Sequence, residues 1–189
     1  MAAFALASSI SPGPVNLVAL SAGARYGLRA SLRHVTGATL GFTLLLLAIG
    51  LGLHQLLQHW PWLQSLLHGV GVAFLLYMAI GLARDDGRLD NGKAQRVPGL
   101  LTGAAMQWLN PKAWLASLAG MSAFASDGEP QLVGQFAGLY FVICYLSIAC
   151  WAYAGAFLRS YLEQPRRMRL FNRSLALLLA ASALYLLLW

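Results

Sequence analysis

Lys112 is the residue of this chain whose type and position most clearly indicate chemistry. It lies near the middle of an apolar run, Gly99–Ala125, directly after Asn110 and Pro111. A lysine at the centre of a membrane span costs roughly 2.5–3.5 kcal/mol on insertion scales, so it normally faces protein or a water-filled cavity. We therefore interpret Lys112 as part of a functional site.

A second apolar run, residues 2–22, is interrupted in a similar way by Ser11-Pro12-Gly13-Pro14. Proline lacks the N–H that a helix interior needs, but it is tolerated at the first helical position after a Ser or Asn cap. The pairs Ser11-Pro12 and Asn110-Pro111 both have this form. We predict that each run forms two half-helices, the second restarting at the proline near the middle of the membrane.

A restarted helix presents unbonded N–H groups and the positive end of its dipole, which together favour an anion. Lys112 adds a full positive charge, while the carbonyls freed by the breaks and the side-chain amides could accept from an ammonium group. This combination predicts a site for a small zwitterion such as an amino acid. The expected residues are Pro12, Gly13, Pro14, Asn16, Gln107, Asn110, Pro111 and Lys112. Two alternatives stay open: the prolines are only structural kinks, or Lys112 bonds to the freed carbonyls instead of the substrate.

Other chemistry is weakly represented. All six acidic residues fall between the apolar runs, so we expect no carboxylate proton relay, and the histidines have no metal-ligand spacing, so we expect no metal or cofactor. His34 is a candidate proton carrier, but we interpret it as an interfacial side chain beside Arg33. Cys144 and Cys150 lie roughly 9 Å apart along one predicted helix, too far for a disulfide, and we interpret them as packing residues.

The composition is that of an integral membrane protein. Hydrophobic residues make up 59% of the chain and charged residues only 10%, whereas soluble domains carry about 25% charged residues. A span needs about 20 apolar residues. We predict six spans in an all-α fold: 2–22, 35–53, 63–83, 99–125, 131–157 and 174–189. Residues 1–21 contain no Lys or Arg, so we expect no signal peptide.

The positive charge is segregated along the chain. Apart from Lys112, every Lys and Arg falls in the connections after the first, third and fifth predicted spans. The positive-inside rule then places these three connections in the cytoplasm and both termini outside. The segregation favours a lipid bilayer over nucleic acid as the partner of the net charge.

The two halves of the chain are related. Residues 1–83 and 99–189 each hold three predicted spans, joined by a polar linker at 84–98. Because three is odd, the second half must enter the membrane inverted, as in transporters built from inverted repeats. The broken runs hold matching places in the two halves. Small-xxx-small pairs permit close helix contacts or a homodimer seam, which stays open: Gly37/Gly41, Gly99/Gly103 and Gly134/Gly138. Three tryptophans are expected at the membrane interface: Trp60, Trp62 and Trp189.

These motifs resemble those of the lysine exporter/homoserine–threonine exporter family, most closely its cysteine/O-acetylserine exporter-like branch. The matching segments are Ser11–Asn16, Ala22–Gly27, Gly37–Phe42 and Asn110–Trp114. The resemblance implies proton-driven export of amino acids or close derivatives across the bacterial inner membrane, by antiport and without enzymatic chemistry. It also implies a functional role for the motif residues Pro12, Gly13, Pro14, Asn16, Asn110, Pro111 and Lys112.

Two other classes of function compete with an exporter. A passive channel would show a polar face along several helices, and a structural membrane subunit needs no site, but the polar residues gather at the two breaks. A transmembrane thiol–disulfide relay needs a cysteine pair at the centre, and neither broken run contains cysteine. The resemblance implies a neutral amino acid, cysteine-like or O-acetylserine-like, as the expected substrate.

Overall fold

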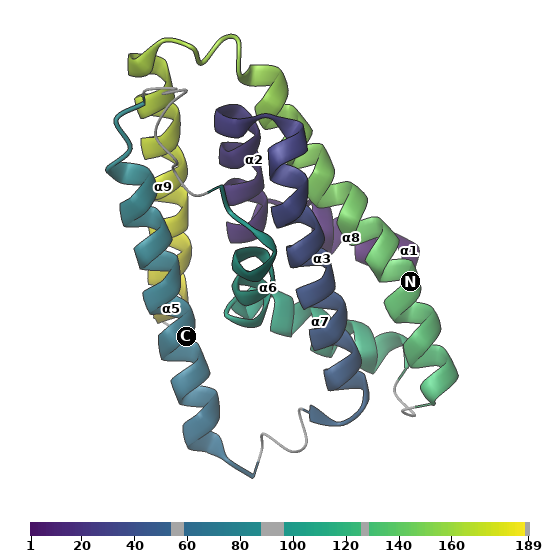
Figure 1. Cartoon of the computed structure of the whole chain (residues 1–189). Coiled ribbons are helices and arrows are strands. Elements are labelled where there is room, and N and C mark those ends of the chain that lie inside the picture. The colour runs from purple at the N-terminus through teal and green to yellow at the C-terminus, as the bar shows by residue number, and fades with distance from the viewer. Residues whose placement is uncertain (54–58, 88–96, 126–128, 188–189) are drawn as a thin grey trace.

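The computed structural model describes residues 1–53, 59–87, 97–125 and 129–187, and within these ranges every regular element is a helix. Figure 1 shows the helices: α1 (Ala2–Ile10), α2 (Pro14–Tyr26), α3 (Leu28–Gly50), α5 (Pro61–Ala83), α6 (Leu100–Trp108), α7 (Pro111–Phe124), α8 (Pro130–Leu158) and α9 (Pro165–Leu187). The predicted all-α class is confirmed. Most of the predicted linker (88–96), together with His54 and Trp189, lies outside the described residues.

Two described helices, α3 and α8, are each long and apolar enough to cross a membrane. The pair α1 and α2 passes the same test together and bends by 60° at its break, giving a third candidate span. Large apolar side chains cover the outside of the bundle, as lipid contact requires; Leu101, Phe157 and Leu177 are 86%, 74% and 72% exposed. The prediction of six spans goes beyond what helix length and composition show.

The first break contains two prolines, and the helix restarts at the second. Proline drives the residue before it out of the helical region. Ser11 is accordingly extended, with φ −62° and ψ 142°, and so is Gly13, with φ −164° and ψ 171°. The earliest residue that can begin α2 is therefore Pro14. The prediction of a Ser11 cap with a restart at Pro12 is wrong, because Pro14 holds Gly13 extended.

The second break follows the predicted form. Asn110 is the N-cap of α7, its side-chain oxygen accepts a hydrogen bond from the backbone N–H of Lys112 at 3.2 Å, and Pro111 is the first helical residue. A single proline leaves the preceding α6 free to end with a normal turn at Leu109.

Two connections are shorter than predicted. Residues 23–34 were expected as a loop, but only Gly27 separates α2 from α3, with φ +80°, a conformation suited to glycine. The last span was expected to begin at 174, but α9 begins at Pro165. Arginine is a good helix former, so a helix can begin with charged turns before its apolar run. Hydropathy marks only the start of the apolar run and therefore misses these turns.

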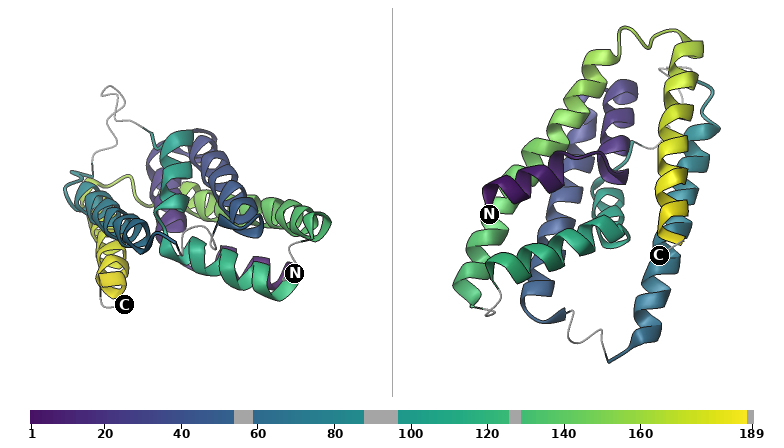
Figure 2. Two further views of the ribbon diagram at one scale, coloured as in Figure 1. Left: turned by 90° about the horizontal axis from the view of Figure 1, so that it is seen from below. Right: turned by 180° about the vertical axis from the view of Figure 1, so that it is seen from behind.

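The helices pack in a repeated pattern. α1 and α2 lie against α8, α6 and α7 lie against α3, and α5 pairs with α9, while α3 and α8 meet at the centre. In the right-hand view of Figure 2, α1 and α7 both cross the bundle obliquely. Glycines permit the closest approaches: a Cβ on Gly23 would collide with the Ala152 carbonyl, and one on Gly37 with Leu100.

His34 is buried, so the prediction of an interfacial side chain is wrong. Its exposure is 0%, and its Nε2 lies 3.4 Å from the Val15 carbonyl oxygen of α2. Gly103 of α6 packs directly on the backbone of His34. This close contact places α6 over the turn of α3 that contains His34, a residue predicted to lie in an exposed connection.

Candidate functional site

The two helix breaks touch through Lys112. Its Nζ donates to the Ser11 carbonyl at 2.9 Å and to the Ser11 hydroxyl at 2.8 Å, and it lies 3.3 Å from the Pro12 carbonyl. Segments about a hundred residues apart in the sequence are thus joined by one side chain. The lysine places a cation at the negative C-terminal end of α1, which favours it there.

The other carbonyls freed at the end of α1 are also occupied. The Asn16 amide nitrogen donates to the carbonyls of Ser9 and Ser11 at 2.8 and 2.9 Å. Trp151 Nε1 of α8 donates to the Ile10 carbonyl at 2.9 Å. Side chains from α2, α7 and α8 therefore hold this half-helix end, and the carbonyls expected to serve an ammonium ligand already accept bonds from the protein.

The end of α6 is held in a similar way. Trp114 Nε1 donates to the Trp108 carbonyl at 2.8 Å, and the two indole rings meet edge to face. This bond fastens the first turn of α7 to the last turn of α6. Both breaks are therefore fixed by indole N–H groups.

The two restarted helices differ at their N-termini. The first N–H of α7 is engaged by the Asn110 side chain, whereas Gly13 caps α2 without any side-chain bond. The first N–H groups of a helix have no partner within it. Lys112 lies directly on Gly13, because a Cβ there would be 3.2 Å from Nζ. The positive N-terminal end of α2 and the Lys112 ammonium group therefore lie next to each other.

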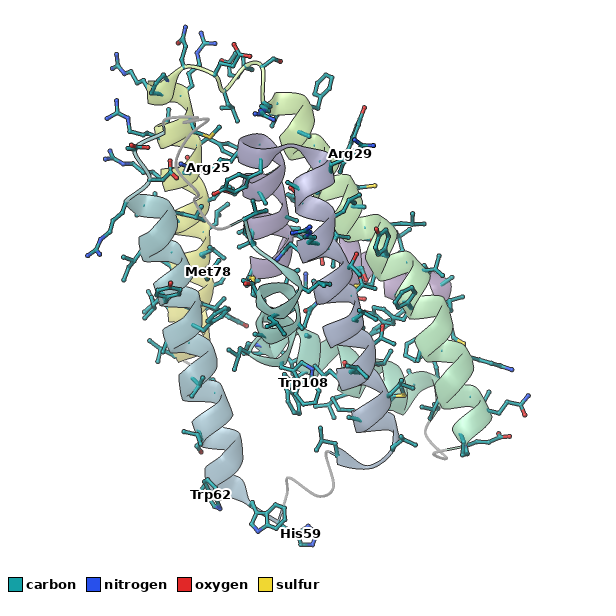
Figure 3. All side chains as sticks on the ribbon, in the orientation of Figure 1. Arg25, Arg29, His59, Trp62, Met78 and Trp108 are labelled. Atoms are coloured by element: carbon teal, nitrogen blue, oxygen red, sulfur yellow. The ribbon has the colours of Figure 1, made fainter. Side chains whose placement is uncertain are left out.

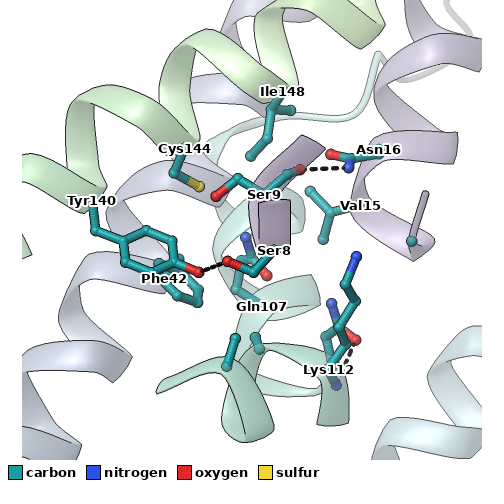
Figure 4. Close-up of a pocket in the computed structure, with 14 residues that line it drawn as sticks. Ser8, Ser9, Val15, Asn16, Phe42, Gln107, Lys112, Tyr140, Cys144 and Ile148 are labelled. Carbon is teal, nitrogen blue, oxygen red and sulfur yellow. Dashed lines mark hydrogen bonds between the residues drawn. The ribbon is translucent and has the colours of Figure 1, made fainter. Parts of the chain in front are cut away.

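A cavity of about 40 Å³ opens beside this contact, as Figure 4 shows. That volume accommodates a few waters, so it suits a small polar occupant. Among the predicted site residues, five line it: Gly13, Asn16, Gln107, Asn110 and Lys112. Pro12, Pro14 and Pro111 do not line it, and they act by shaping the breaks.

The cavity also contains residues that the sequence did not single out. Ser8 and Ser9 come from the last turn of α1, Phe42 from α3, and Tyr140 and Cys144 from α8. The Tyr140 and Ser8 hydroxyls are 2.5 Å apart. The sequence offers one indication of these residues, because Ser8 and Ser9 lie just before the first break. Tyr140 and Cys144 stand four positions apart, which puts them on one helix face, but nothing in the sequence says which face points inward.

The charge of Lys112 is balanced by dipoles. Among the described residues, no carboxylate lines the cavity, and the acids lie near helix ends, as with Asp85 after α5 and Glu129 before α8. Asp85 pairs instead with Arg25 at the far end of α2. A bound anion could therefore face Lys112 without competing with a resident carboxylate.

Comparison with known proteins identifies the family. The LysE type translocator family matches residues 6–188. The chain is 29% identical over 185 residues to a protein of Salmonella choleraesuis (strain SC-B67) named cysteine/O-acetylserine efflux protein, covering 96% of this chain and 91% of that protein. Proteins of the same name match from Klebsiella pneumoniae subsp. pneumoniae (29% over 184 residues, 96% and 90% covered) and Escherichia coli (strain K12) (27% over 183 residues, 95% and 92% covered).

No solved structure matches the chain. The resemblance inferred from the two broken motifs is confirmed by the family match and by the names of these relatives. Because the match covers almost the whole sequence, the chain belongs to the LysE type translocator family and is a multi-pass membrane transporter, not an enzyme.

Proposed function

We propose that this protein is a secondary transporter that exports small neutral amino acids, or close derivatives, across the bacterial inner membrane. The single observation that carries the proposal is Lys112, held at the contact of two broken helices beside a small polar cavity. The names of the relatives point to cysteine and O-acetylserine as the first substrates to test.

The cavity supports binding of a carboxylate. Lys112 Nζ and the uncapped N-terminus of α2 offer a positive charge and backbone donors at one place. A substrate carboxylate would replace the carbonyl and hydroxyl acceptors that Lys112 now contacts. Hydrogen bonds to charged groups contribute about 1.5–3 kcal/mol, and a carboxylate adds a full negative charge that the present acceptors of Lys112 lack.

The repeated packing supports an arrangement of six spans in two inverted halves, residues 1–83 and 99–189. The contact of α1 and α2 with α8 in one set corresponds to the contact of α6 and α7 with α3 in the other, as expected if the two halves are related. In this arrangement the two breaks face each other at mid-membrane, and the substrate binds between the halves. Alternating access would then proceed by movement of one half against the other.

The distribution of charge supports an orientation with both termini in the periplasm. In Figure 3, Arg25 and Arg29 lie at one end of the bundle, while Trp62 and His59 lie at the opposite end. The basic end is the cytoplasmic one by the positive-inside rule. Trp62 is 65% exposed, as expected of an anchor at the opposite interface.

Proton coupling is part of the proposal. Among the described residues no carboxylate lines the cavity, so we take Lys112 and the substrate as the proton carriers, with the buried His34 as the other candidate. Antiport requires that the proton and the substrate exclude each other from the site, so that the carrier returns with a proton in place of the substrate. Dependence of efflux on an imposed pH gradient, in proteoliposomes, measures this coupling.

A substrate screen tests the proposed function. Proteoliposomes are loaded with L-cysteine, O-acetyl-L-serine, L-threonine or L-lysine, and they should release the small neutral compounds fastest. With Lys112→Met, the rate of release should fall to that of loaded liposomes without protein. Leu101→Ala, at an 86% exposed position of α6, is the matched control and should transport normally. Release of none of the four compounds, or unchanged release by Lys112→Met, would contradict the proposal.

A further inference from the structure

A zwitterionic substrate needs acceptors for its ammonium group, and at the end of α1 the Asn16 and Trp151 side chains already engage the carbonyls of Ser9 and Ile10. Tyr140 offers a replacement. It is 2% exposed, it lines the cavity, and its ring is fixed between Phe42 and Phe136, with centroids 4.5 and 5.4 Å away. The hydroxyl of a side chain held in this way has a defined position.

The direction of the bond between Tyr140 and Ser8 follows from counting protons. A serine hydroxyl has a single proton, and Ser8 lies 2.6 Å from the Phe4 carbonyl, an acceptor that needs that proton. At the 2.5 Å contact, the Tyr140 hydroxyl must therefore donate to Ser8. The phenolic oxygen keeps its lone pairs available beside the cavity (Figure 4).

Ser9 supplies a second acceptor. Its buried hydroxyl makes no well-formed hydrogen bond among the described residues, and it borders the cavity next to Tyr140 and Cys144, the two side chains with which it interacts. A buried hydroxyl left without a partner is unfavourable. The Ser9 and Tyr140 oxygens thus form a small acceptor cluster at the cavity.

The spacing of the serines that Lys112 and Tyr140 contact suits an α-amino acid. Lys112 contacts Ser11 and Tyr140 contacts Ser8, and these serines are one turn apart on the same chain segment, joined by a 3.1 Å bond from the Ser11 hydroxyl to the Ser8 carbonyl. Side chains one helical turn apart are roughly 5–6 Å from each other at Cβ. An α-amino acid has its carboxylate and ammonium on one carbon and fits such a short spacing.

We propose that Tyr140 and Ser9 accept the ammonium group of an α-amino acid whose carboxylate binds at Lys112. This inference rests on the proposed export function and adds the subsite that distinguishes amino acids from other small carboxylic acids. Tyr140 is then a specificity-determining residue: it selects for the amino group, whereas Lys112 selects for the carboxylate.

The test compares L-cysteine with 3-mercaptopropanoate, which lacks only the amino group. Calorimetry uses the full chain in lipid nanodiscs under reducing conditions. Tyr140→Phe and Ser9→Ala should each weaken L-cysteine binding roughly 10- to 150-fold, the range for a hydrogen bond to a charged group, and leave 3-mercaptopropanoate binding unchanged. Two controls should change neither affinity: Tyr153→Phe, 60% exposed on the same helix, and Ser117→Ala, whose buried hydroxyl also has no partner among the described residues but does not line the cavity.

The outcomes separate this subsite from the export function. Equal loss for both ligands, or no loss for L-cysteine in Ser9→Ala, would overturn the ammonium subsite while the export function stands. A wild-type protein that binds neither ligand would overturn both. If Tyr140→Phe fails to give a folded protein by size-exclusion chromatography, Ser9→Ala decides alone, because the Ser9 hydroxyl makes no well-formed hydrogen bond among the described residues.

Discussion

Lys112 on α7 donates a hydrogen bond from Nζ to the backbone carbonyl of Ser11, with 2.9 Å between the two atoms. The bond joins two interrupted helices from opposite halves of the chain. It also means that the lysine has two roles, because it caps α1 and faces the cavity. Under the proposed function, substrate binding and the position of α1 are linked through one ammonium group.

Lys112→Met should reduce both transport and stability. Loss of the charge removes the carboxylate partner, so substrate binding should weaken roughly 10- to 150-fold. Removal of a partly buried charge alone would be neutral or stabilising, but here the Ser11 hydroxyl and the Pro12 carbonyl lose their donor, and the Ser11 carbonyl keeps only Asn16. We expect a net destabilisation of about 1–3 kcal/mol, measured by thermal unfolding in detergent. Normal efflux at matched membrane levels would make the lysine purely structural.

Gly13→Ala should impair transport more than stability. The backbone at Gly13 is extended, with φ −164°, so alanine is not strained there. Its Cβ would lie 3.2 Å from Lys112 Nζ and must displace the side chain. A shifted binding group commonly costs an order of magnitude or more, so efflux should fall about tenfold. Gly69→Ala, which meets no atom within 4 Å, is the control and should leave efflux unchanged.

Gly23→Ala should destabilise the protein. The added Cβ would collide with the Ala152 carbonyl and push α2 away from α8. Overpacking of this kind costs about 1–3 kcal/mol. Gly138→Ala on α8 meets no atom within 4 Å and should be neutral or slightly stabilising. Thermal unfolding of the two variants side by side measures the difference, and equal stabilities would show that the two helices can separate freely.

Cysteine labelling should show that the basic end faces the cytoplasm. Arg84 and Glu129 are exposed near opposite predicted surfaces, so Arg84→Cys should react with a membrane-impermeant maleimide only after lysis, and Glu129→Cys in intact cells. Gly87 is unsuitable, because it is buried with φ +71°. The background carries Cys150→Ala to remove the exposed native thiol. The reverse labelling pattern would invert the proposed topology.

The sequence by itself determined the local features of this protein. A proline without an N–H interrupts a helix wherever the rest of the chain lies, so both breaks were readable, and so was the Asn110 cap. Apolar runs and segregated charge gave the all-α class for the same reason: they depend on neighbours in sequence. Even the restart at Pro14 follows from a local rule, since a proline holds the residue before it extended.

The tertiary structure decided which groups meet. The sequence left open whether Lys112 bonds to a substrate or to freed carbonyls, and only the approach of α7 to α1 makes it a partner of Ser11. The burial of His34 depends on Gly103 from the other half of the chain. Tyr140 enters the cavity because α8 turns that face toward Ser8. Such contacts depend on the packing of whole helices, and no local pattern of residue types encodes them.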